Sequence, residues 1–165
     1  MSQSFNQEVV ERLKAQFPKS IESINEFRND VTVQIQKTDI VRVCEFLKTD
    51  PDLAFEMVID LCGVDKYRPE GRFEVIYNLY SLKNKAYFRL KVLVDENECV
   101  VDSVTSVWSG ANWHERETYD MYGISFAGHP DLRRMYMPEE FEYYPLRKDF
   151  PLMGIPDSIP LPRKK

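Results

Sequence analysis

The sequence has few of the residues from which redox centres and nucleotide sites are usually built. Its three cysteines, at positions 44, 62 and 99, lie far apart without a CxxC pair. Iron–sulfur clusters need clustered cysteines, and a scattered, odd set favours reduced thiols in a cytoplasmic-type compartment. The six glycines stand singly, which excludes a glycine-rich phosphate-binding loop. We therefore expect no cofactor in this chain.

Long apolar runs and an excess of basic residues are also missing. No apolar run approaches the ~20 residues that a membrane-spanning helix needs, so any work at a membrane would depend on partners. The net charge of −5 argues against a nucleic-acid partner, which requires a concentrated basic face. The N-terminal residues 1–17 are amphipathic and charged, unlike a signal peptide.

Hydrophobic periodicity predicts an α+β fold, an α/β two-layer domain. Apolar residues recur at helical spacing over residues 4–17 and 38–50, and a third helix is expected over 112–122. We expect Ser4, Thr38 and Asn112 to cap these helices, with Glu115 completing the last capping box and Gly123 ending that helix in a left-handed conformation. Strands are expected over residues 21–27, 31–36, 55–64, 73–82 and 87–94.

The resulting order, α-β-β-α-β-β-β-α, indicates two helices packed on one face of a mixed, mostly antiparallel sheet. We expect an α/β core domain over residues 1–108. Residues 109–165 would hold a helix and an extended, proline-rich C-terminal arm that binds a partner.

The arm, residues 125–165, combines prolines with aromatic residues. It holds seven of the ten prolines, and proline disrupts helices and central strands because it lacks an N–H group. Disordered tails usually have few aromatics, yet this arm carries six: Phe126, Tyr136, Phe141, Tyr143, Tyr144 and Phe150. The composition predicts an extended strap pressed along another protein surface.

Two basic pairs in the arm, Arg133-Arg134 and Arg147-Lys148, lie among apolar residues. Arginine in such a place suits bidentate pairing with carboxylates of a partner. Solvated charge is the alternative, and it is the better interpretation of the terminal residues 163–165.

An acid–base enzyme built on His114, Glu117 and Asp120 is the hypothesis from a different functional class. No second histidine follows His114 at the spacing of a zinc-protease motif, and we expect no metal site. Glu117 and Asp120 are three residues apart on the expected helix and could share a cation from Arg133 or Arg134. Structural salt bridges are therefore favoured over catalysis, and Trp108 and Trp113 are expected to be packing anchors.

One stretch resembles a known family. Glu115-Arg116-Glu117-x-x-Asp120-Met121-Tyr122, followed by His129 and by Arg133-x-Met135, is similar to the signature of the 30-kilodalton subunit (the C subunit) of respiratory NADH:quinone oxidoreductase, complex I. The similarity continues in the run at 145–151 and upstream at 61–65, 72–77 and 108–113, so it covers about residues 38–152. Tyr143 stands where this family commonly has glycine.

The resemblance implies a subunit of the hydrophilic arm of a proton-translocating enzyme, without a redox centre of its own. FMN, iron–sulfur clusters and the quinone site would lie in other subunits. The main partner would be the quinone-site subunit, named D, at the cytoplasmic face of the bacterial inner membrane. The partner-interface residues carried over from the signature are Glu115, Arg116, Glu117, Asp120, Gly123, His129, Pro130, Arg133, Arg134, Pro145, Leu146, Arg147, Lys148 and Asp149. An equivalent subunit of a membrane-bound hydrogenase or of a ferredoxin- or F420-linked relative stays open.

Overall fold

The structure, a computed structural model, describes residues 2–28 and 30–155. Along the chain the elements are α1 (Ser2–Gln16), β1 (Ile21–Phe27), β2 (Asp30–Ile35), a 3-10 turn (Lys37–Asp39), α2 (Ile40–Thr49), β3 (Met57–Asp65), β4 (Phe73–Ser81), β5 (Ala86–Val94), β6 (Val100–Asp102), α3 (Ala111–Tyr122) and β7 (Ser125–Ala127). The predicted α+β order is confirmed, with β6 and β7 in addition.

The main sheet has five strands in the order β1-β2-β5-β4-β3. β2 and β5 run parallel, and the other neighbours are antiparallel, as predicted. Along β5, the buried Phe88, Leu90 and Val92 alternate with residues that are exposed or half-buried. Such alternation places one face of the sheet in the core and leaves the other less covered.

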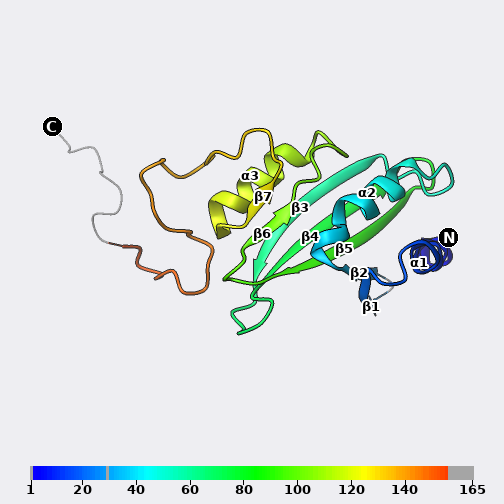
Figure 1. Cartoon of the computed structure of the whole chain (residues 1–165), viewed down its shortest axis with the longest axis horizontal. Helices are drawn as coiled ribbons and strands as arrows, with labels where there is room; N and C mark the ends of the chain where they lie inside the picture. The colour runs from blue at the N-terminus through cyan, green and yellow to red at the C-terminus, as the bar shows by residue number, and fades with distance from the viewer. Residues whose placement is uncertain (1, 29, 156–165) are drawn as a thin grey trace.

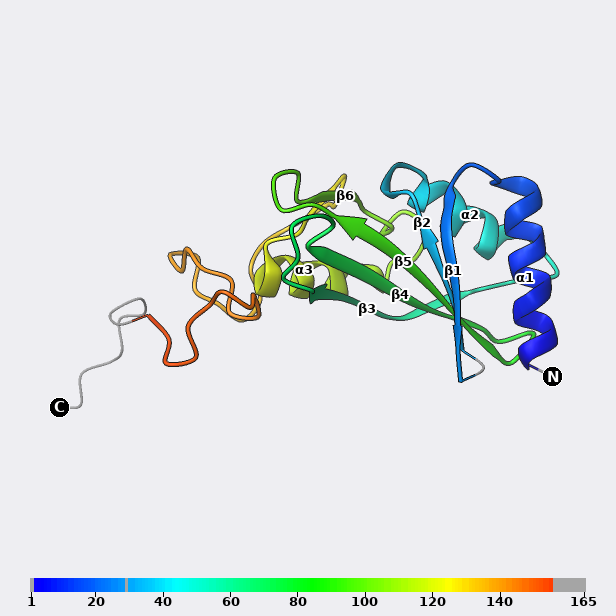
Figure 2. The same ribbon diagram turned by 90° about the horizontal axis from the view of Figure 1, so that it is seen from below.

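Helices α1 and α2 contribute to the same apolar core. Val9 and Leu13 of α1 and Val43 and Leu47 of α2 are fully buried, together with the inward-facing residues of the sheet. Helix α1 ends two residues before Pro18, since a residue that precedes proline disfavours the helical conformation. Figures 1 and 2 show α1 at one end of the molecule and the C-terminal segment, residues 128–155, at the other.

Helix α3 packs on β3, the strand at the edge of the sheet. Close approach is possible because Gly63 has no side chain. A Cβ at Gly63 would lie 2.7 Å from a ring carbon of Tyr122 and 3.0 Å from a methyl carbon of Thr118. Trp108, just before the helix, is buried, and its indole N–H donates to the carbonyl of Phe55 (3.0 Å). The prediction that Trp108 anchors packing is confirmed.

The predicted helix caps are wrong, whereas the predicted helix end is right. Ser4 lies inside α1 and does not precede it. The residue before α2 is Asp39 and not Thr38, and its side chain makes no cap bond. The residue before α3 is Gly110 and not Asn112, and glycine has no side chain to form a cap. At α3, the turn before the helix accepts the first N–H groups through the carbonyls of residues 108 and 109, so no side chain is needed. Gly123 ends α3 at φ +74°, and its N–H bonds to the Tyr119 carbonyl (2.8 Å).

After α3, the chain makes one short strand, β7, and continues to residue 155 in turns and loops. β7 lies parallel to β6, and Phe126 of β7 belongs to the core. The start of the predicted arm is therefore part of the folded body. The proposed boundary at residue 108 stays a prediction. Within residues 2–28 and 30–155, no helix combines the length and apolarity required to cross a bilayer.

Candidate partner interface around α3 and the C-terminal segment

Asp120 of α3 organises the segment that follows β7. Its Oδ2 accepts hydrogen bonds from the backbone N–H groups of Met135 (2.9 Å), Tyr136 (2.7 Å) and Met137 (3.1 Å). Its Oδ1 pairs with the Arg134 guanidinium at 2.8 Å. Burial acts to raise the pKa of Asp120, but these donors outweigh it and hold the pKa below its usual range. The fully buried carboxylate thus fixes residues 134–137 against the helix.

Glu115 is also fully buried, but it has no cationic partner among the described residues. Its carboxyl oxygens lie 2.6 Å from the Ser103 hydroxyl and 2.8 Å from the Val104 N–H, which donates to it. Burial raises the pKa of Glu115 to about 7, against the opposing effect of these two hydrogen bonds. The predicted capping role of Glu115 is wrong: the side chain joins α3 to the loop after β6.

Arg116 of α3 bonds to the backbone of residues 133 and 134, beside the Asp120 contact. Its guanidinium donates to the backbone carbonyls of Arg133 (3.1 Å) and Arg134 (3.3 Å) and lies 5.1 Å from the Trp113 ring centre. Trp113 is 61% exposed, so the prediction of a packing anchor is wrong there. Arg133 forms an exposed bidentate pair with Asp131 (2.7 and 2.8 Å) and is largely solvated.

His129 shapes the turn between β7 and this segment. Its Nδ1 accepts the N–H of Asp131 (3.0 Å), so Nε2 carries the proton and donates to the carbonyl of Asn112 (3.2 Å). Gly128 precedes it at φ +79° and the exposed Pro130 follows. His129 therefore joins the turn to the start of α3.

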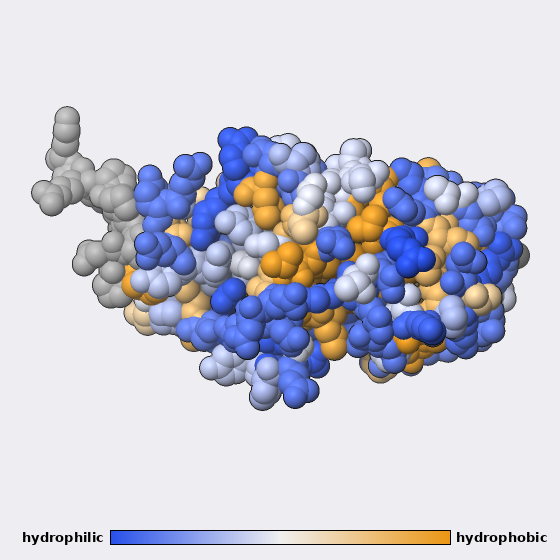
Figure 3. Space-filling view, in the orientation of Figure 1, coloured by the Kyte–Doolittle hydropathy of each residue, from blue (hydrophilic) through white to orange (hydrophobic). Residues whose placement is uncertain are grey.

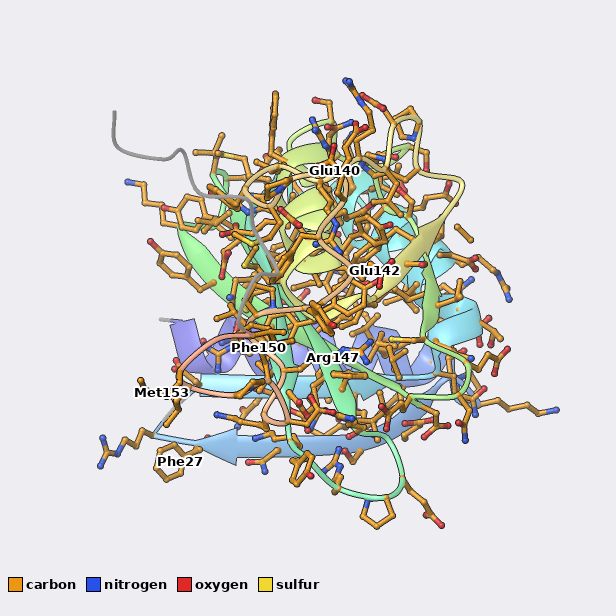
Figure 4. All side chains as sticks on the ribbon, turned by 90° about the vertical axis from the view of Figure 1, so that its left-hand side faces the viewer. Phe27, Glu140, Glu142, Arg147, Phe150 and Met153 are labelled. Atoms are coloured by element: carbon orange, nitrogen blue, oxygen red, sulfur yellow. The ribbon has the colours of Figure 1, made fainter. Side chains whose placement is uncertain are left out.

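A second group of contacts holds residues 146–149 against the C-terminal end of α3, and we call it the second anchor. The Leu146 N–H bonds to the Met121 carbonyl (3.1 Å), and Arg147 Nε donates to the Tyr122 carbonyl (2.6 Å). The Arg147 guanidinium lies 4.6 Å from the ring centre of Tyr144 and 5.0 Å from that of Phe73. In Figure 4, Arg147 lies near the middle of the molecule and Met153 toward its margin.

The ends of β3 and β4 complete this anchor. Arg72 pairs with Asp65 (2.9 Å) and with Asp149 (3.0 Å), and Asp65 also accepts the backbone N–H of Lys148 (2.8 Å). Burial acts to raise the pKa of Asp65, but Arg72 and the backbone donors lower it on balance. Asp65 and Arg72 lie within the runs that carry the family resemblance, but sequence reasoning did not assign them this role.

The residues of the acid–base hypothesis do not form one site. His114 Nδ1 is 3.8 Å from Asp60, the Glu117 side chain is exposed, and both oxygens of Asp120 already have partners. Of the predicted shared cation, the Asp120–Arg134 pair is confirmed, whereas Glu117 shares no cation with Asp120 among the described residues. In the described part of the chain, no cluster of three or more His, Cys, Asp or Glu could hold a metal ion.

The C-terminal segment turns several charges inward and several apolar side chains outward. Phe141 is buried and packs edge-on against Tyr143 and Phe150 (centroids 5.6 and 6.2 Å apart). Figure 3 shows apolar surface between polar side chains at this end of the molecule. The exposed large apolar residues of the segment are Tyr136, Tyr143, Leu146, Leu152 and Met153. Residues 128–155 are thus attached to the body and present apolar side chains to the outside.

Comparison with known proteins identifies the family. Residues 33–156 match the family described as "Respiratory-chain NADH dehydrogenase, 30 Kd subunit". The chain belongs to this family. The resemblance drawn from the signature is thereby confirmed.

Two curated members of the family are C subunits of NADH-quinone oxidoreductase. That of Roseiflexus sp. (strain RS-1) is 51% identical over 147 residues, which are 89% of this chain and 84% of the relative. That of Geotalea uraniireducens (strain Rf4) is 46% identical over 155 residues, covering 94% and 93% of the two chains.

Solved structures agree on the fold. A trypsin-resistant fragment of Nqo5 superposes with a TM-score of 0.65 at 31% identity, over 76% of this chain and 98% of the fragment. A chain of the membrane-bound sulfane sulfur reductase, an archaeal respiratory membrane complex, gives a TM-score of 0.68 at 21% identity, over 89% of this chain and 86% of that one. The second similarity concerns the fold alone.

Proposed function

We propose that this chain is a subunit of the hydrophilic arm of a proton-translocating NADH:quinone oxidoreductase and has no redox centre of its own. It would support assembly and hold the quinone-site subunit, named D, while electrons pass from NADH to quinone. Family membership and about 50% identity to curated C subunits support this proposal. FMN, iron–sulfur clusters and quinone would bind other subunits, and the complex would place the chain at the cytoplasmic face of the bacterial inner membrane.

The docking role is supported mainly by the apolar side chains that the C-terminal segment exposes. Arg134 and Arg147 bond to groups of the same chain, so they hold the segment in place and are not free for a partner. Aromatic and large apolar anchors dominate the binding energy of most interfaces. The contact with the quinone-site subunit would therefore rest on the exposed apolar residues of the segment, with Arg133 at the rim.

The test uses the assembled complex and the full-length chain. In the double variant Leu152→Ser and Met153→Ser, two fully exposed side chains lose their apolar surface without disturbing the described core. We expect at least a tenfold loss of co-purification with the quinone-site subunit. The matched control is Leu82→Ser, an exposed leucine in the β4–β5 hairpin. Equal retention of the double variant and the control would refute docking through this segment.

The alternative is the equivalent subunit of a membrane-bound hydrogenase or of a ferredoxin- or F420-linked relative. The archaeal reductase shares the fold at 21% identity, whereas the two curated relatives at 51% and 46% identity are NADH-quinone oxidoreductase subunits. The higher identity favours NADH as the electron donor of the complex. Assay of the purified complex with NADH, reduced ferredoxin and reduced F420 decides between them: electron transfer from ferredoxin or F420, with none from NADH, would support the alternative.

A further inference from the structure

A hollow is lined by residues of α1, β2, β5, β4 and β3, at the end of the sheet near α1. The two parallel strands, β2 and β5, are paired only where Thr32–Gln34 face Arg89–Lys91. Next to this short pairing is a hollow with a volume of about 390 Å³, lined by Asn6, Asp30, Val31, Ile59, Asp60, Asn78, Tyr87, Phe88 and Arg89. We call it the Arg89 hollow.

Its floor is buried and contains one polar atom without a partner. Val31 and Phe88 supply apolar surface, and Asn6 of α1 is only 5% exposed. No group of the described residues donates to Asn6 Oδ1. Buried acceptors are almost always hydrogen-bonded, so an unpaired oxygen at this place is unusual.

The wall of the hollow holds a guanidinium in a fixed position. Arg89 Nε donates to Asn78 Oδ1 (2.9 Å), and Asn78 Nδ2 donates to Asp60 Oδ2 (3.2 Å). The amide of Asn78 thus orients Arg89 and Asp60 together. Within the described residues, the two terminal nitrogens of Arg89 have no hydrogen-bond or ion-pair partner. A guanidinium held in this way is preorganised to receive a carboxylate.

The other cation in this part of β5 behaves differently. Lys91, two residues along the same strand, is 3.5 Å from Glu74, a buried carboxylate that Lys66 and Arg68 also approach. Lys91 therefore has a carboxylate partner within the chain, whereas Arg89 has none among the described residues. The two residues form a matched pair for experiment.

The rim of the hollow is apolar and exposed. Tyr87 is 64% exposed and its ring centre lies 4.7 Å from that of Tyr80, while Ile59 of β3 is also exposed. Exposed apolar residues around a polar pocket are typical of an interaction site.

We propose that the Arg89 hollow is a second docking surface, which receives a loop or terminus of a partner protein carrying an Asp or Glu side chain. The carboxylate would pair with Arg89, and an apolar neighbour in the same segment would cover Val31, Ile59 and Tyr87. A polypeptide supplies these two groups together. Asp30 and Asp60 also line the hollow, and they favour further N–H or cationic groups beside the carboxylate. The proposal rests on the proposed function only in that the chain works within an assembly.

A photo-crosslinker at the rim tests which protein occupies the hollow. p-Benzoylphenylalanine at position 87, in the full-length chain within the assembled complex, should crosslink to one segment of one partner that contains Asp or Glu. A complex that assembles without a crosslink from this position, or with one to a segment lacking acidic residues, overturns the proposal.

Charge substitution tests the carboxylate. Arg89→Gln should lower the crosslinking yield at least tenfold, while Lys91→Gln leaves it within twofold. Arg89→Asp should lose crosslinking and regain it when the acidic residue of the crosslinked partner segment is changed to Arg. Equal yields for Arg89→Gln and Lys91→Gln, or no rescue by the exchanged pair, would contradict a direct ion pair. Thermal unfolding of each variant chain verifies that the fold is retained.

The two docking proposals fail separately. The Leu152/Met153 variant reports on the C-terminal segment, and the Arg89 variants report on the part of the molecule near α1, at the other end (Figure 2). Suppose that only the Leu152/Met153 variant loses the complex and that crosslinking from position 87 does not depend on the charge at position 89. That result rejects the docking role of the Arg89 hollow and leaves the role of the C-terminal segment standing. If the unaltered chain joins no complex, the proposed function itself is rejected.

Discussion

The ring of Tyr144 lies directly against the backbone of Gly123, at the end of α3. A Cβ at Gly123 would be 2.6 Å from two atoms of this ring and 2.8 Å from the Arg147 guanidinium. Gly123 also adopts φ +74°, which residues other than glycine rarely tolerate. One glycine thus both ends the helix and lets the C-terminal segment approach it.

Gly123→Ala should therefore destabilise the chain more than the same change at Gly128. Gly128 has a similar backbone, with φ +79°, but nothing lies within 4 Å of its Cβ position. Both variants carry the cost of the left-handed backbone, and only Gly123→Ala adds overpacking, of about 1–3 kcal/mol. Urea unfolding measures the difference, and limited proteolysis should show faster cleavage near residues 144–147. Equal free energies of unfolding for the two variants would contradict the close packing of Tyr144.

Asp120→Asn should release residues 134–137 from α3. The substitution removes the charge that Arg134 and three backbone N–H groups share, at a cost of roughly 3 kcal/mol of unfolding free energy. Because the folded pKa of Asp120 is lowered, this stabilisation is present above about pH 4 and is lost as the pH falls through the folded pKa. The difference between the parent chain and the variant should accordingly shrink in acid.

The control for Asp120→Asn is Asp131→Asn, which breaks the exposed pair with Arg133. Exposed pairs contribute little, so this variant should unfold like the parent chain. A pH-independent difference for Asp120→Asn would show that the carboxylate is not the stabilising species.

Glu115→Gln should remove a pH dependence of the unfolding free energy whose sign is opposite to that expected for Asp120. The pKa of Glu115 is about 7 in the folded chain against 4.5 as the ordinary value, so the folded chain binds this proton more tightly than the unfolded chain. The stabilisation is complete below pH 4.5 and is lost as the pH rises through about 7, amounting to about 3 kcal/mol. Gln keeps the shape and can donate to the Ser103 hydroxyl at every pH.

Urea unfolding at about pH 5 and about pH 8, on either side of the folded pKa, measures this effect. The parent chain should lose more stability between the two values than the Gln variant does. If the two chains change in parallel, Glu115 is already ionised at the lower pH in the folded state.

Arg72→Met should detach residues 148–149 from the body. Arg72 is buried between Asp65 and Asp149, and removing it leaves the Asp65 carboxylate buried without a cation, at a cost of about 3–5 kcal/mol. The matched control is Arg42→Met, which breaks an exposed pair with Asp39. Free energies of unfolding and the rate of proteolysis near Lys148 measure both. An Arg72 variant as stable and as protease-resistant as the control would contradict this anchor.

Local sequence pattern was sufficient for the helices and strands of the main sheet. Apolar spacing locates α1, α2 and β5 to within a few residues, since burial of one face is a local property of each element. Gly123 was predictable for the same reason, because the left-handed end of a helix depends on one residue. The short strands β6 and β7 were missed: three residues carry too little periodicity, and their pairing joins residues 100–102 to 125–127.

What only the tertiary structure decided is the partner of most charged side chains. The signature drew attention to Glu115, Asp120, Arg134 and Arg147, and helical spacing suggested Arg134 as a cation for Asp120, but the same local reasoning suggested a helix cap for Glu115 and a partner's carboxylate for Arg147. The observed partners, such as Ser103 for Glu115 and residues 134–137 for Asp120, lie more than ten residues away along the chain. Burial in the fold removes these charges from water, and a buried charge is stable only with whichever distant donor or opposite charge the fold brings to it. The sequence alone thus determined which residues form the helices and the strands of the main sheet. The assembled fold determined which donor or opposite charge each buried charged side chain contacts.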